Sequence, residues 1–188
     1  MRKPILLAAS LIILCVFQVD AQVQKSDQNL GFGFDVSSLG GDFGESRVNL
    51  FATYSYYFTK NLSLGVGPRY GWTKTKSDDG QGGVSTNNVT VLGYNIFFNY
   101  NLLTSGGFVL PYFGAQYTSA TQKREGSQDL QTSSVGGNVG VKFFLTERFN
   151  IDNNISFTRV FGSNQTTDTD ANVIQVNVGL GYIIGRRN

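Results

Sequence analysis

Histidine is absent from the 188 residues, and cysteine occurs once, at Cys15. The lack of histidine removes the commonest general base and metal ligand, so the sequence predicts neither an enzyme nor a bound metal or cofactor. The net charge of +2 gives no argument for a nucleic-acid partner. Glycine (23 residues) and aromatic residues (13%) are plentiful, which is not the composition of a disordered chain.

The first 21 residues have the pattern of a secretory signal peptide. Arg2 and Lys3 precede an apolar run at 5–17, and Ala21 ends the segment with a small residue. A lipoprotein signal that uses Cys15 is disfavoured because Leu14 stands where a small residue is expected. A retained helical anchor needs roughly 20 apolar residues, more than this run contains. We therefore predict cleavage after Ala21, and a single exported domain at 22–188 without disulfides.

Apolar and polar residues alternate along the rest of the chain, as in "RVNLFATYSYYF" at 47–58. This alternation indicates β-strands with two unlike faces. It recurs eight times, in the predicted strands Leu30–Leu39, Ser46–Thr59, Leu62–Lys74, Asn88–Leu102, Phe108–Thr121, Thr132–Leu145, Asn150–Phe161 and Asn172–Ile184. The sequence predicts an all-β fold, an eight-stranded antiparallel up-and-down transmembrane barrel.

The predicted connections alternate in length, as in outer-membrane barrels. Lys60-Asn61, Leu103–Gly107 and Thr146–Phe149 are tight, and 40–45 is the first and shortest of the longer connections between them. The other connections are long and polar, at Thr75–Asn87, Gln122–Gln131 and Gly162–Ala171. We predict that the tight turns face the periplasm and that the long loops are extracellular.

The polar strand faces carry mainly Gly, Ser, Thr and Asn rather than Lys and Glu. A soluble lipocalin-type barrel has the same alternation with its polar face in water, where charged residues would be expected. The composition of the polar faces favours a crowded lumen, so the apolar faces are predicted to contact lipid. Ten aromatic residues are predicted at the two membrane interfaces: Tyr56, Phe58, Tyr70, Trp72, Phe98, Tyr100, Tyr117, Phe143, Phe157 and Tyr182.

The stretches "LGFGFDV", "LSLGVGPRYGW", "VLPYFGAQY", "VGGNVGVKFFL" and "VIQVNVGLGYII" resemble the Gly-rich strands of the eight-stranded outer-membrane β-barrels of the OmpA and OmpX type. The resemblance spans 30–184. It implies location in the outer membrane, contact with its lipid, and assembly by the barrel insertion machinery. Family members usually end on an aromatic residue, whereas this chain ends "IIGRRN", so either Tyr182 serves as that signal or the signal is altered.

The resemblance favours a structural role in the envelope, with the extracellular loops available for contacts with an unidentified ligand. Two other functions stay open at this point: a narrow pore for small solutes or ions, and adhesion or ligand binding through Thr75–Asn87 and Gln122–Gln131.

Four charged residues fall on predicted lumen faces: Asp35, Arg69, Lys142 and Asp152. An unpaired charge inside a narrow barrel is costly, so we predict ion pairs between Lys142 and Asp152 and between Asp35 and Arg69. Bulky lumen side chains are expected to leave little room for water, at positions Phe51, Tyr57, Phe97, Tyr112 and Phe144. The sequence thus predicts a closed lumen. If the ion pair between Asp35 and Arg69 blocks it, the conductance should rise in an Arg69→Ala variant.

Overall fold

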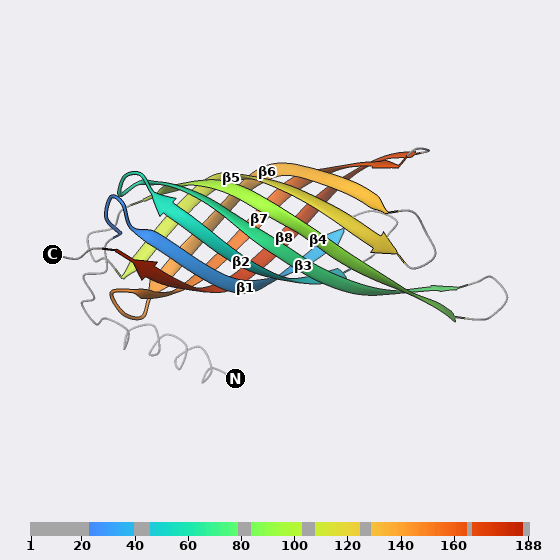
Figure 1. Cartoon of the computed structure of the whole chain (residues 1–188), viewed down its shortest axis with the longest axis horizontal. Helices are drawn as coiled ribbons and strands as arrows, with labels where there is room; N and C mark the ends of the chain where they lie inside the picture. Colours follow the sequence, from blue (N-terminus) through green and yellow to red (C-terminus); the bar gives the residue numbers. More distant parts are fainter. Residues whose placement is uncertain are drawn as a thin grey trace, which may run out of the picture.

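Strands of the computed structural model form a closed antiparallel barrel in which each strand pairs with its neighbours in the sequence (Figure 1). The structure describes residues 23–39, 46–78, 84–102, 108–124, 129–164 and 167–185, so the predicted signal peptide and the segment 40–45 lie outside it. The strands are β1 (Gln28–Leu39), β2 (Ser46–Tyr57), β3 (Leu62–Asp78), β4 (Val84–Asn101), β5 (Val109–Arg124), β6 (Leu130–Phe144), β7 (Phe149–Asn164) and β8 (Thr167–Ile184). The predicted fold class and strand number are confirmed.

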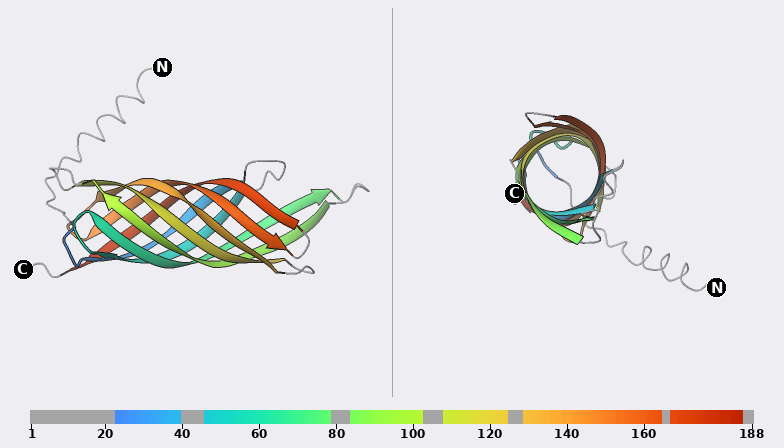
Figure 2. Two further views of the ribbon diagram at one scale, coloured as in Figure 1. Left: turned by 90° about the horizontal axis from the view of Figure 1, so that it is seen from above. Right: turned by 90° about the vertical axis from the view of Figure 1, so that its right-hand side faces the viewer.

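The barrel closes through an antiparallel ladder between β1 and β8 that runs from Gln28 opposite Ile184 to Leu39 opposite Val173. The end-on view in Figure 2 shows the resulting ring of strands. Closure gives every strand two hydrogen-bonded neighbours, so the barrel has no open sheet edge. None of the described residues forms a helix long and apolar enough to cross a membrane.

The side chains separate by face as the alternation predicts. Large apolar side chains point outward and are exposed, among them Phe32 (60%), Val139 (61%) and Phe157 (58%). Polar side chains point inward, and Asp35 and Asn101 are fully buried. A soluble barrel would have the opposite arrangement, so the structure places the apolar face on the outside.

The long polar connections are the main difference from the sequence prediction. Much of Thr75–Asn87 is strand, because β3 and β4 stay paired as far as Asp78 opposite Val84. Likewise β5 extends to Arg124, and only 165–166 separate the ends of β7 and β8 in the predicted loop Gly162–Ala171. Backbone pairing continues although the hydrophobic alternation has ended, since the ladder needs no apolar face and Thr-rich segments favour strands. These extensions form the projecting hairpins at the right of Figure 1.

Bulky lumen side chains lie over glycines of neighbouring strands. The Phe97 ring occupies the space that a Cβ at Gly65 would need, and Tyr112 covers Gly140 in the same way. Eight strands enclose a space that side chains can just fill, so a large residue on one strand requires a missing side chain beside it. The many lumen glycines are therefore explained by space.

Gly67 and Gly137 provide a matched test of this explanation. A Cβ at lumen-facing Gly67 would overlap the backbone carbonyl oxygen of Ala52, whereas a Cβ at outward-facing Gly137 would meet only the Gly114 carbonyl oxygen, at 3.5 Å. We expect Gly67→Ala to destabilise the barrel by about 1–3 kcal/mol through overpacking, and Gly137→Ala to cost nothing measurable. Urea unfolding in lipid vesicles measures both, and equal losses would contradict the explanation.

Candidate functional site in the barrel lumen

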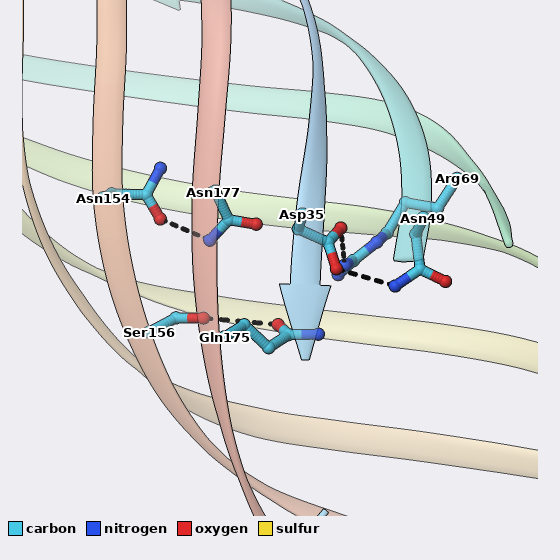
Figure 3. Close-up of polar contacts among 7 residues, drawn as sticks. All are labelled: Asp35, Asn49, Arg69, Asn154, Ser156, Gln175 and Asn177. Carbon is cyan, nitrogen blue, oxygen red and sulfur yellow. Dashed lines mark hydrogen bonds and ion pairs between the residues drawn. The ribbon is translucent and has the colours of Figure 1, made fainter. Parts of the chain in front are cut away.

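The Asp35 carboxylate of β1 lies inside the barrel between two partners, one from the adjacent strand β2 and one from β3 (Figure 3). Arg69 of β3 forms an ion pair with Asp35 Oδ2 through its Nη2 atom. Asn49 of β2 donates a hydrogen bond from Nδ2 to Asp35 Oδ1 at 2.7 Å. The Asp35 side chain is fully buried and that of Arg69 is 10% exposed, so the pair is held away from water. We call Asp35, Asn49 and Arg69 the outer seal.

Two further polar contacts, between β7 and β8, lie beside the outer seal and continue it into a belt of polar side chains around the lumen, as Figure 3 shows. Asn177 donates from Nδ2 to Asn154 Oδ1 at 2.6 Å, and the Ser156 hydroxyl lies 3.2 Å from Gln175 Oε1. Each contact joins residues on adjacent strands. The belt therefore links neighbouring parts of the wall through side chains in addition to the backbone ladder.

The second ion pair predicted from the sequence lies near the end of the barrel that carries the tight turns, which we call the turn end. Lys142 of β6 forms an ion pair with Asp152 Oδ2 of β7, directly opposite in the ladder. The Tyr112 hydroxyl donates to Asp152 Oδ1 at 2.6 Å, and Lys142 Nζ lies 5.0 Å from the centre of the Tyr112 ring. Both carboxylate oxygens of Asp152 thus have partners. The structure brings the four charges together in the two predicted combinations.

An apolar cluster fills the lumen below Lys142. It consists of residues at most 5% exposed: Val23, Tyr57, Leu110, Phe144 and Ile183. We call this cluster the inner seal. The sequence prediction included Tyr57 and Phe144 but missed the other three members. Leu110 and Ile183 could have been found, because Leu110 lies two positions before the predicted lumen residue Tyr112 and Ile183 directly follows Tyr182, which was predicted to face lipid. Val23 precedes the first strand, where no periodicity gives its direction.

A cavity of about 70 Å³ lies in the lumen, lined mainly by polar residues that include Arg69, Lys142 and Asp152 of the ion pairs and Tyr57 of the inner seal. We call it the lumen chamber. Asn99 and Asn138 are more than nine-tenths buried, and both direct side-chain oxygens toward the space over Gly114. These two oxygens, together with Asn95 Oδ1 and Gln116 Nε2, have no protein hydrogen-bond partner. Buried polar groups need partners, and a cavity needs on the order of 10–15 Å³ to hold one water, so the chamber suits several water molecules.

Nine of the ten aromatic residues predicted at the membrane interfaces lie on strand positions whose side chains point outward, and the exposed Phe58 follows directly after β2. Tyr56 and Phe58 pack edge to face with ring centres 5.1 Å apart, and the Tyr70 and Trp72 rings are 6.1 Å apart. Their depth in a bilayer remains a prediction, and so does the assignment of Tyr182 as an assembly signal.

Sequence comparison identifies the family. Residues 6–182 match the outer membrane protein beta-barrel domain. The chain belongs to this family. The protein is thus an outer-membrane barrel, and we call its turn end periplasmic and its hairpin end extracellular, as is general for such barrels. No curated protein matches the sequence.

Solved structures of eight-stranded outer-membrane barrels share the fold. Neisserial surface protein A aligns with a TM-score of 0.64 at 13% identity, over 82% of this chain and 96% of that one. OprG of Pseudomonas aeruginosa aligns with a TM-score of 0.64 at 14% identity, over 89% and 100%. The attachment invasion locus protein Ail of Yersinia pestis, in complex with the heparin analogue sucrose octasulfate, aligns with a TM-score of 0.56 at 14% identity, over 86% and 100%. At these identities the similarity shows the fold alone.

Proposed function

We propose that this protein is a non-enzymatic barrel whose closed lumen makes it a structural component of the outer membrane rather than a pore. The observation that carries the proposal is the presence of the two seals. The outer seal holds a buried ion pair, and the inner seal excludes water with apolar side chains. Both lie in a barrel whose strand number leaves room for little more than side chains.

The hydrogen bonds and ion pairs between strands in the lumen support a structural role. The Asp35 carboxylate joins β1 to β2 and β3, and Asp152 joins β7 to β5 and β6. Such contacts stiffen the barrel wall. A conducting lumen instead needs a continuous water path that its polar and charged side chains line without blocking. The four lumen charges are engaged with one another, which also argues against a catalytic role for them.

Single-channel recording of the purified, refolded protein tests the proposal. We expect no steady conductance above that of the protein-free bilayer, because ions would have to displace both seals. A change in gel mobility on boiling, characteristic of detergent-resistant barrels, serves as the check that the recorded protein is folded. A steady, ion-selective conductance from the folded protein would contradict the structural role and favour the narrow pore.

Contacts at the cell surface are compatible with a closed lumen. The paired extensions of β3 and β4 project beyond the other hairpins in Figure 1. Ail, a structural neighbour, is an attachment invasion locus protein solved with a heparin analogue. We therefore include ligand or cell-surface binding by the hairpins as a second candidate function.

A further inference from the structure

The segment before β1 folds back beneath the barrel wall at the periplasmic end. Ser26 N–H donates to the Tyr57 carbonyl oxygen at 2.7 Å, and Tyr57 N–H donates to the Asp27 carbonyl oxygen at 2.9 Å. These bonds attach the segment to the last residue of β2. They direct the Val23 side chain into the inner seal, where it is 1% exposed. We call residues 23–27 the N-terminal lid.

A turn gives the N-terminal lid a defined shape. The Asp27 carboxylate accepts a hydrogen bond from Gln24 N–H at 2.7 Å, and Asp27 N–H donates to the Gln24 carbonyl oxygen at 3.2 Å. Ser26 adopts a left-handed conformation with φ of 72°, which is unfavourable for a residue with a side chain. Tertiary contacts must offset this cost, so the turn is held in place by the barrel.

The C-terminal end of the barrel contacts the same turn. Asp27 is 3% exposed, and its Oδ1 atom lies so close to Gly185 that a Cβ at position 185 would overlap it. Gly185 follows directly after β8, which pairs with β1. The lid thus fits between the beginning of β1 and the end of β8, and the glycine makes the space for it.

The N-terminal lid covers a lumen that is polar immediately above it. Tyr57, which bonds to the lid, lies opposite Ser63 in the ladder, and Ser63 lines the lumen chamber. The inner seal therefore stands between the polar groups of the lumen chamber and the periplasm. The ladders that pair β1 with β2 and with β8 both begin at Gln28, after the lid, so we expect them to form without it.

We propose that the N-terminal lid is a removable closure that completes the inner seal with Val23, and that the lumen chamber is shut by two seals in series, the inner seal below and the outer seal above. This proposal rests on the closed lumen proposed above and adds the segment that closes its periplasmic end. A pore that opened would need both seals displaced. For that reason Arg69→Ala, predicted from the sequence to raise conductance, should not do so by itself.

Accessibility of a thiol introduced by Ser63→Cys tests the lid directly. The predicted mature chain, from residue 22, lacks cysteine, so a small charged methanethiosulfonate reagent would label that position alone. With the lid present we expect no reaction in detergent micelles, since Ser63 is 2% exposed. Deletion of residues 23–26 should raise the labelling rate at least tenfold, with the boiling-dependent mobility change retained. Lys60→Cys, in the exposed β2–β3 turn, should react equally with and without the lid.

Slow labelling after the deletion in a folded barrel would overturn the assignment of the lid. Conductance provides the second measurement and uses Asp35→Ser/Arg69→Ser, which removes the outer seal without leaving an unpaired charge. We expect steady conductance only when this double substitution is combined with the deletion of 23–26. Conductance from the double substitution alone, or none from the combination, would overturn the model of two seals in series. Conductance from the unmodified protein would instead contradict the proposed function, so the two failures are distinguishable.

Discussion

Arg69→Ser should destabilise the barrel by about 3–5 kcal/mol, the largest effect that we expect from one lumen substitution. Asp35 is fully buried, and after the substitution only the Asn49 amide would remain to stabilise its negative charge. Removing one partner of a buried ion pair leaves an uncompensated charge, and that penalty exceeds the value of the contact itself.

The double variant Asp35→Ser/Arg69→Ser is the control, and it should lose less stability than Arg69→Ser alone because no charge is left unpaired. Urea unfolding in lipid vesicles measures both free energies. The fluorescence of Trp72, the single tryptophan of the chain, reports the transition from the lipid-facing side. If the double variant were the less stable of the two, Asp35 would stabilise the barrel even without Arg69, and the cost of burying an unpaired charge would not explain the effect.

Val176→Arg should destabilise the barrel by about 2–4 kcal/mol, as a charged residue does near the bilayer midplane. Val176 is 48% exposed on the outer face, and its ladder partners Val36 and Ile155 are also exposed and apolar. Arginine there would meet hydrocarbon on every side. The same unfolding experiment measures the loss, and refolding yield gives an independent readout.

Asn177→Ser, one position along the same strand, is the matched control. Asn177 points into the lumen and donates to Asn154, so the substitution should cost about 0.5–1.5 kcal/mol, the value of one hydrogen bond. A larger loss from Asn177→Ser than from Val176→Arg would mean that the apolar face does not contact lipid.

Periodicity in the sequence was enough to determine the barrel and its two faces. Successive side chains of a strand lie on opposite faces whatever the neighbouring strands are, so the two faces of each of the eight strands can be assigned from its own sequence. The closeness of Lys142 and Asp152 also follows locally, because a tight turn places residues on either side of it at equal height. Where the side chains on both faces are polar, as in the β3–β4 hairpin, periodicity disappears and the strand ends were misplaced.

Only the tertiary structure decided how the side chains pack together in the lumen. The ion pair of Asp35 with Arg69 spans β2, and its geometry depends on strand tilt and on the asparagine between them. The glycines beneath Phe97 and Tyr112 fit because neighbouring strands bring those positions side by side. Val23 enters the inner seal through backbone bonds of a turn with no hydrophobic pattern of its own. These features depend on contacts between residues distant in sequence, whereas alternation records only which face a residue occupies.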